Sequence, residues 1–285
     1  MRVDFRLVDV FTEVPFAGNQ LCVVPETPDG VDGDAMQTLA REIAFSETTF
    51  VTESSPATYR MRIFTPGGEL PFAGHPTLGT AFTLVSEGRV TSPVTQSTAA
   101  GDVPVEIDLD VRFGWMRQFP PEFGPEFDDR ALVSRAAGLS VDDIHPDLPM
   151  QVVSTGLGHL LVPLRDDDAL RRSVRDDAAC AEAIERSGGE CLYLFAIRGA
   201  GDVRARMFDA DLSIGEDPAT GSAAGPLGAY LAARGLAGMP GKAVVAQGEQ
   251  VGRPSFIHLD VRREGGWEVR VGGGVQVVGE GSFRL

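Results

Sequence analysis

A degenerate internal repeat constrains the fold of this chain more than any other feature. The segment HPTLGTA at 75–81 aligns without gaps on DPATGSA at 217–223, and AGNQLCVVP at 17–25 aligns on TGLGHLLVP at 155–163. The two pairs are 142 and 138 residues apart, close to half of the 285 residues. Repeats in one order and at nearly one spacing indicate two similar halves. A site for a small molecule is therefore expected in a cleft between the halves.

Short strands and helices recur along both halves, separated by glycines and prolines. Alternating or β-branched apolar residues predict strands at 2–11, 47–52, 58–64, 103–111, 151–154, 158–163, 191–197, 242–247, 256–262, 267–272 and 275–278. Apolar residues at helical spacing predict helices at 34–44, 77–87, 129–138, 176–187 and 219–234. The Pro-rich stretch FPPEFGPE at 119–126 is interpreted as the boundary between the halves.

Composition excludes several classes of function. The 25 Lys+Arg residues against 41 Asp+Glu residues give a net charge of −16, whereas binding to nucleic acid or to an anionic membrane requires a basic surface. No apolar run approaches the roughly 18 residues of a membrane span, and the amino terminus alternates like a strand rather than a signal peptide. Three scattered cysteines predict neither a disulfide framework nor a metal site. We expect a cytoplasmic protein with a small-molecule partner.

Two helix-opening turns are the main candidates for a ligand site. In GHPTLG, Pro76 is expected at the first helical position, and in GEDPATG, Asp217 and Pro218 are expected as N-cap and first helical residue. If both helix N-termini face the cleft, they favour an anion such as a carboxylate between Gly74–Thr77 and Thr220–Ser222. Well-capped helices in tight loops are the other interpretation. Four glycines in these turns permit close backbone approach to a ligand: Gly74, Gly79, Gly215 and Gly221.

Glu47 lies where a predicted helix stops and a strand begins, in EIAFSETTF. Flanked by Phe45 and Phe50, its carboxyl group is expected to have a raised pKa and to serve as a general base. A glutamate that faces solvent at the start of a strand is the alternative. In the repeat, Glu47 corresponds to Glu190.

Three more polar residues are candidates. His75 stands between a glycine and a proline and suits proton relay or hydrogen bonding to a substrate, although an N-cap or surface histidine fits equally. Asn19 is the only asparagine, and its Gly-Asn context also suits a turn with positive φ. Ser222 lies in TGSAAG rather than in G-x-S-x-G, which disfavours a serine hydrolase.

Several motifs, in order along the whole chain, resemble the PhzF (phenazine biosynthesis-like) family: DVFTEVPFAGNQLCVV, SETTFV, RIFTPGGELPFAGHPTLGTA, GEDPATGSAAGPLGAYL, QGEQVGRPS and VGGGVQVVGEGSF. The resemblance implies a diaminopimelate-epimerase-like α+β fold. Its two halves are related by a pseudo-twofold axis, and each is a mostly antiparallel, barrel-like curled sheet around a central helix. The expected halves are 1–118, completed by 275–285, and 119–274.

The same resemblance implies an isomerase that moves a proton on a small carboxylate substrate, as in dihydro-hydroxyanthranilate chemistry, without a cofactor or a metal. Glu47 corresponds to the family's acid/base residue, and His75, Asp217 and Ser222 are expected as supporting catalytic groups. The expected substrate-binding residues are Asn19, Ser46, Gly74, Thr77, Thr220 and Gly221. Related proteins are commonly homodimers, so a homodimer is expected.

Epimerases on this fold instead place one catalytic cysteine at the turn that opens each central helix. The matching positions here are Ala73 and Thr220, so a racemase with two thiols is disfavoured. Two alternatives to the isomerase stay open. One is an epimerase or racemase that uses Glu47 with Asp217 or His75, and the other is a non-catalytic small-molecule-binding protein.

Overall fold

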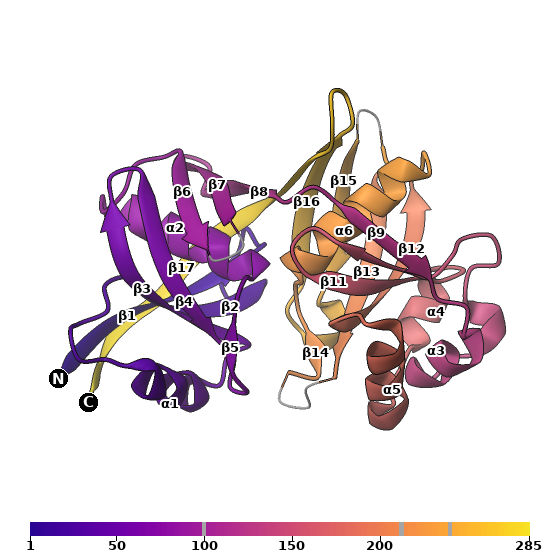
Figure 1. Cartoon of the computed structure of the whole chain (residues 1–285), viewed down its shortest axis with the longest axis horizontal. Helices are drawn as coiled ribbons and strands as arrows, with labels where there is room; N and C mark the ends of the chain where they lie inside the picture. The colour runs from indigo at the N-terminus through magenta and orange to yellow at the C-terminus, as the bar shows by residue number, and fades with distance from the viewer. Residues whose placement is uncertain (99–100, 211–213, 239–240) are drawn as a thin grey trace. The chain divides into compact units, whose positions relative to one another are not determined.

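The last strand of the chain, β17 (Glu268–Arg284), pairs antiparallel with the first, β1 (Arg2–Val10), in the computed structural model (Figure 1). The structure describes residues 1–98, 101–210, 214–238 and 241–285. It divides into two units, one formed by residues 1–117 with 272–285 and the other by residues 118–271. The end of the chain therefore belongs to the same unit as its beginning.

Eight strands close into a barrel in the first unit. Each pairs with the next in the order β1, β2 (Asn19–Val24), β3 (Glu47–Ser55), β4 (Thr58–Phe64), β6 (Val94–Thr98), β7 (Gly101–Asp108), β8 (Phe113–Gln118) and β17. The β2–β3 and β4–β6 pairs are parallel, and the short β5 (Glu69–Leu70) pairs with the end of β4. Side chains must fill the interior of a barrel this small.

The barrel encloses helix α2 (Gly74–Ser86), which packs against β1, β2, β3, β6 and β7. Every residue from Gly74 to Leu84 is buried, as expected for a helix that is apolar on all sides. Helix α1 (Gly33–Ile43) is amphipathic instead. It packs its apolar face against a separate core cluster that includes Phe50 and Phe64.

The second unit repeats this order of elements. Its strands are β9 (Glu122–Glu126), β10 (Gln151–Ser154), β11 (Gly158–Pro163), β12 (Cys191–Gly199), β13 (Asp202–Asp209), β14 (Glu216–Asp217), β15 (Lys242–Gln247) and β16 (Ser255–Arg262). The β11–β12 and β13–β15 pairs are parallel, in the places of β2–β3 and β4–β6. Helix α6 (Gly221–Ala233) is buried like α2. The remaining helices are α3 (Arg130–Ala136), α4 (Asp167–Arg172), α5 (Asp177–Ser187) and the short 3-10 turns η1 (Val141–Asp143) and η2 (Glu249–Val251).

The predicted fold class is therefore confirmed: two similar α+β halves, each with a mostly antiparallel sheet curled around a central helix. The gap-free alignment of the helix-opening turns is wrong, however. Helices α2 and α6 have 13 residues each and begin 147 residues apart, so 75–81 does not superpose on 217–223. That alignment matched Pro76, which lies inside α2, to Pro218, which precedes α6.

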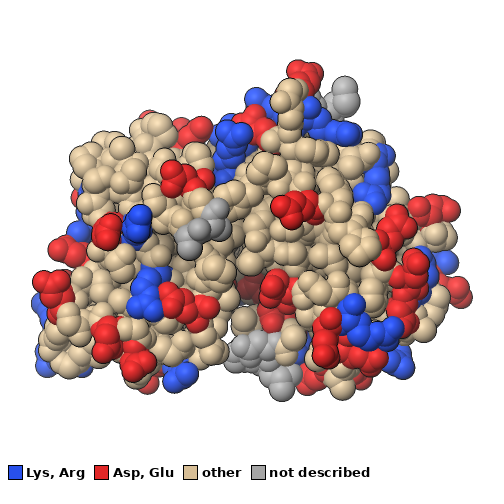
Figure 2. All heavy atoms as spheres, viewed as in Figure 1, with Lys and Arg blue, Asp and Glu red and all other residues tan. Residues whose placement is uncertain are grey.

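Other expectations need smaller corrections. The strands predicted at 267–272 and 275–278 are one continuous strand, β17, and the expected boundary at 119–126 contains strand β9. The pattern did not predict β2, β6, β8, β9, β13 and α4. Among the residues that the structure describes, no helix has the length and apolar character needed to span a membrane. Figure 2 shows acidic and basic side chains interspersed on the face drawn.

Candidate active site

Glu47 is the first residue of β3 and follows the sharp end of α1. Ala44 caps that helix with a left-handed backbone, φ 55°, and its N–H bonds to the carbonyl of Ala40, so the chain turns at once toward the strand. The Glu47 side chain is 13% exposed, and its Oε2 lies 3.3 Å from Nε2 of His75. The carboxyl group thus faces the start of the buried helix α2.

His75 is the second residue of α2 and is held from both sides of its ring. Its Nδ1 lies 3.2 Å from Nδ2 of Asn19, the first residue of β2. The hydroxyl of Ser46 donates a hydrogen bond of 3.1 Å to Oδ1 of Asn19. The first unit therefore brings four of the predicted site residues into one chain of contacts, Ser46–Asn19–His75–Glu47. Asn19 and His75 are almost completely buried.

The expected apolar flank of Glu47 is wrong in one respect. Side chains alternate along a strand, so Glu47 and Thr49 share one face of β3 and Phe50 lies on the other. Thr49 accordingly contacts Thr80 of α2 at 2.8 Å, whereas Phe50 packs edge-on against Phe64 in the cluster beneath α1. Phe50 therefore does not desolvate the Glu47 carboxyl group, and the raised pKa of Glu47 stays a prediction.

The start of α2 also differs from expectation. The N-cap is Ala73, so Gly74 is the first helical residue and Pro76 the third. Proline is tolerated there because the first-turn N–H groups have no partner within the helix. Thr77 is fully buried, with its hydroxyl oxygen 2.7 Å from Oε1 of Gln96 and 2.8 Å from the carbonyl of Ala73. The Thr77 hydroxyl thus bonds to these groups rather than to the Glu47–His75 pair.

In the second unit, Asp217 ends β14 and is not an N-cap, contrary to expectation. The N-cap of α6 is Thr220, whose hydroxyl donates a hydrogen bond of 2.7 Å to Oδ2 of Asp217. The carbonyl of Gly221 accepts a hydrogen bond from Gln118, and Ser222 is half-buried as the second helical residue. Asp217, Thr220 and Ser222 therefore gather at the opening of α6.

Gln247, at the end of β15, organises this turn and was not predicted as a site residue. Its amide nitrogen donates to the carbonyl of Asp217 at 2.8 Å and to the hydroxyl of Thr220 at 3.0 Å. Its amide oxygen accepts hydrogen bonds from the Tyr193 hydroxyl at 2.9 Å and from the Thr220 N–H at 3.3 Å. Gln247 lies in QGEQVGRPS, so the motif was visible in the sequence and the contacts were not.

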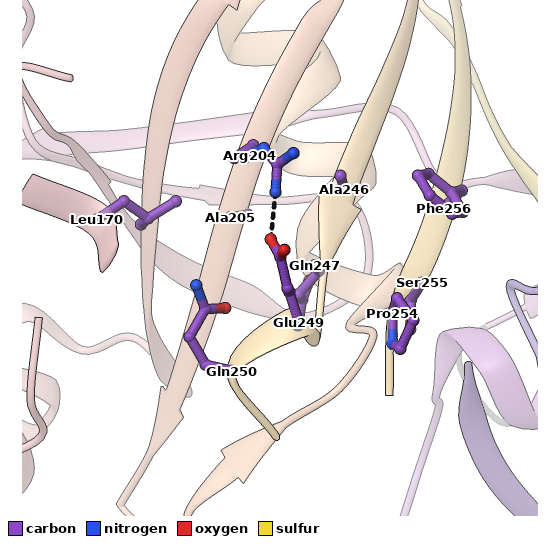
Figure 3. Close-up of a pocket in the computed structure, with 10 residues that line it drawn as sticks. All are labelled: Leu170, Arg204, Ala205, Ala246, Gln247, Glu249, Gln250, Pro254, Ser255 and Phe256. Atoms are coloured by element: carbon purple, nitrogen blue, oxygen red, sulfur yellow. Dashed lines mark hydrogen bonds and ion pairs between the residues drawn. The ribbon is translucent and has the colours of Figure 1, made fainter. Parts of the chain in front are cut away.

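Gln247 also lines a pocket of about 220 Å³ in the second unit, shown in Figure 3. Arg204 and Glu249 form an ion pair within the pocket, and Leu170 and Phe256 supply apolar walls. The charged groups that line this pocket already bind each other. Gln247 itself is only 3% exposed, so its amide stays committed to the Asp217–Thr220 turn.

Both central helices differ from the peripheral ones at their N-termini. Aspartate side chains cap α1, α3, α4 and α5, each by accepting a backbone N–H: Asp32, Asp129, Asp166 and Asp176. Neither Ala73 of α2 nor Thr220 of α6 makes a side-chain cap hydrogen bond. Carboxylates nevertheless lie beside both openings, since Glu47 contacts His75 of α2 and Asp217 accepts the Thr220 hydroxyl at α6.

Comparison with known proteins identifies the family. A family model described as phenazine biosynthesis-like protein matches residues 8–281. The chain belongs to the phenazine biosynthesis-like family. A relative from Pseudomonas aeruginosa named trans-2,3-dihydro-3-hydroxyanthranilate isomerase is 35% identical over 283 residues, which cover 98% of this chain and 96% of the relative. A Bacillus subtilis relative named uncharacterized isomerase is 32% identical over 266 residues, 90% of each chain.

A solved structure described as a predicted epimerase from Pseudomonas aeruginosa is also similar. It is 35% identical, with a TM-score of 0.88 over 99% of both chains. As a phenazine biosynthesis-like protein whose relatives are named isomerases, the chain is an enzyme, an isomerase. The expectation of an enzyme is thereby confirmed over that of a non-catalytic binding protein.

Strand registers show which residues of the two halves of this isomerase are equivalent. Thr48 pairs with Phe64 as Leu192 pairs with Phe208, so Glu47 corresponds to Cys191 and not to Glu190. The same reasoning through β5, β14 and the helix starts gives the other equivalences: Leu70 with Asp217, Ala73 with Thr220, and His75 with Ser222. Each ionisable site residue thus has a partner of different chemistry in the other half.

The counterpart of Glu47 is chemically silent. Cys191 is buried, and burial raises the pKa of its thiol well above 9. Its Sγ lies 3.1 Å from Nδ1 of His159, whose pKa burial lowers from 6.5 to about 4. Cys22 and Cys180 are also buried, in β2 and α5. The N-caps Ala73 and Thr220 carry no thiol, so the acid/base groups of this fold's two-thiol racemases have no counterpart there.

Proposed function

We propose that this isomerase moves a proton between two carbon atoms of a small carboxylate-bearing metabolite, with Glu47 as the proton carrier. The contact between the Glu47 carboxyl group and the His75 imidazole, beside the start of a buried helix, carries this proposal. The Glu47 carboxylate takes the proton of an acidified C–H bond and becomes a carboxylic acid. It then returns the proton to another carbon of the same conjugated system as the double bond shifts.

The helix openings have the complementary role of binding anionic groups. The first turn of α2 at Gly74 presents the positive end of that helix beside Glu47, where it stabilises the charge that develops on proton removal, and the first turn of α6 at Gly221 presents the equivalent helix end in the second unit. Asp217, Thr220 and Ser222 shape the second opening, and His75 supports Glu47 at the first. Acid/base groups and main-chain dipoles suffice for this reaction, so we propose that it needs no cofactor.

Isomerisation is the better supported of the two reactions that the relatives' names suggest. An epimerase that inverts one carbon needs a proton donor on the face opposite the base. The N-caps Ala73 and Thr220, where epimerases on this fold are expected to carry paired cysteines, have no thiol, and the thiol of Cys191, the equivalent of Glu47, is buried and uncharged. An epimerase that uses Asp217 or His75 as its second group is the alternative that the stereochemistry of the product tests. A single carboxylate suits proton transfer along one face of the substrate.

The test uses trans-2,3-dihydro-3-hydroxyanthranilate, the compound in the relative's name, as a probe substrate in D2O. Glu47→Gln keeps the shape of the side chain and removes the base, so turnover should fall at least about 10²-fold. Glu53→Gln is the matched control, because Glu53 is exposed farther along the same strand. NMR of the product then separates deuterium at a new carbon, which we expect, from inversion at the original one.

Turnover by Glu47→Gln within twofold of the Glu53→Gln control would contradict the assignment of the base. Inversion at one carbon would instead establish the epimerase. If neither reaction occurs with this probe, a panel of other unsaturated carboxylates screened for deuterium uptake tests the same assignment on a different substrate.

A further inference from the structure

On the Nδ1 side of the His75 ring, hydrogen bonds continue through Asn19 to Ser46. We infer that Asn19, oriented by Ser46, is a positioning residue that fixes His75 in the tautomer with its proton on Nε2. The inference rests on the proposed role of Glu47 and assigns Asn19 and Ser46 a task other than contact with substrate. His75 then directs its Nε2–H toward the Glu47 carboxylate, whose Oε2 is 3.3 Å away, and this favours the carboxylate form that accepts a proton.

The direction of each hydrogen bond follows from the groups involved. Oδ1 of Asn19 accepts the Ser46 hydroxyl, so the amide presents Nδ2 to the imidazole. An amide nitrogen can only donate, and Nδ1 of His75 must therefore accept and carry no proton. A neutral imidazole has its single proton on the other nitrogen, Nε2, which lies 3.3 Å from Oε2 of Glu47.

The opposite orientation of the amide is disfavoured by Glu47. Rotating the Asn19 amide by half a turn would place Oδ1 against Nδ1 and require a proton there. The neutral ring would then direct the lone pair of Nε2 at the Glu47 carboxylate, which is repulsive at this distance. An imidazolium would satisfy both neighbours, but a charged ring is costly at a position that is 3% exposed. A carboxylic acid at Glu47 would also satisfy them by donating to Nε2, but it could not then act as the base.

The location of Asn19 suits this task better than substrate contact. It is 1% exposed and is anchored at the start of β2, where the strand pairs with β1 through Asn19 and Val10. Ser46 directly precedes Glu47, so the residue that orients the amide and the proposed base belong to the same short turn. A shift of that turn would move the base and the tautomer control together.

The experiment exploits the composition of the chain, which has one asparagine and four histidines. The full-length protein is labelled with 15N at asparagine and histidine, and His75→Gln assigns the His75 signals. We expect Nδ1 of His75 to show the shift of an unprotonated ring nitrogen, and to be scalar-coupled to the Asn19 amide across the hydrogen bond. A protonated Nδ1 in the wild-type protein would overturn the inference, whatever the enzyme's activity.

Asn19→Asp tests the consequence for catalysis. A carboxylate in place of the amide accepts Nδ1–H, so the spectrum should show a protonated Nδ1, and turnover should fall at least about 10-fold. Ser54→Asp, which adds the same charge at an exposed position on β3, is the matched control. An unchanged tautomer in Asn19→Asp, or a changed tautomer with turnover within twofold of the control, would overturn the positioning role. If turnover is lost in Glu47→Gln but not in Asn19→Asp, the assignment of Glu47 as the base still stands.

Discussion

The buried imidazole of His159 makes a quantitative prediction about acid stability. Burial lowers its pKa from 6.5 to about 4. Between these pH values the unfolded chain therefore binds a proton at His159 that the folded chain does not bind. The free energy of unfolding must therefore fall as the pH drops from 6.5 toward 4. Proton linkage gives a loss of about 2–3 kcal/mol between pH 4.5 and pH 4.

The perturbation that isolates this effect is His159→Leu. Leu21 occupies the equivalent position in the first half, because Leu21 lies beside Glu47 as His159 lies beside Cys191. Leucine removes the titrating group and keeps an apolar core. In urea unfolding, the variant should gain about 2–3 kcal/mol relative to the wild type on going from pH 7.5 to 4.5, since all other titratable groups are common to both proteins.

Two results would refute the reasoning. One is a stability difference between the proteins that does not change between pH 7.5 and 4.5. The other is a His159 imidazole that titrates near 6.5 in the labelled protein, which would mean that water reaches the ring.

Two further predictions concern the elements that hold the site. Gln247→Leu leaves the Tyr193 hydroxyl and the groups of the Asp217–Thr220 turn without their partner, so the free energy of unfolding should drop by about 2–4 kcal/mol and turnover should fall. Gln250→Leu, at an exposed position three residues away, is the control, and equal urea midpoints for the two variants would contradict the prediction. Gly79→Ala places a Cβ 2.7 Å from the Leu21 side chain and 2.9 Å from that of Val10. We therefore expect overpacking to lower the free energy of unfolding, measured in urea, by about 1–3 kcal/mol. A free energy of unfolding unchanged within about 0.5 kcal/mol would show that α2 shifts freely in the barrel.

Much of the fold was predictable because repetition is written into the sequence, and the residual errors have physical causes. Three consecutive glycines at 272–274 predicted a break between strands, yet β17 runs through them. A Cβ at Gly273 would lie 2.4 Å from the Phe11 ring, and one at Gly274 would lie 2.4 Å from the carbonyl of Thr12. These glycines permit close packing within the strand, a use that pattern alone does not distinguish from a turn.

The site was predictable only in part, for a related reason. Glu47 and His75 were marked by local motifs, and the structure brings their side chains together. Asn19 and Ser46 were expected to contact substrate, which stays a prediction; the structure adds contacts from Ser46 to Asn19 and from Asn19 to the imidazole. Gln247 was not predicted as a site residue because its role depends on hydrogen bonds to Asp217, Thr220 and Tyr193. These residues lie 27 to 54 positions away in the chain.

The two halves share a backbone fold and differ in chemistry at the position of each ionisable site residue. The first half has Glu47 and His75 where the second has Cys191 and Ser222, and the second has Asp217 where the first has Leu70. A reaction that needs an acid and a base on opposite faces would favour the same group at both positions. Here the second position, Cys191, is buried and its thiol is uncharged. The two halves therefore contribute two helix dipoles but only one carboxylate paired with an imidazole. That division fits a reaction in which one group both removes the proton and returns it.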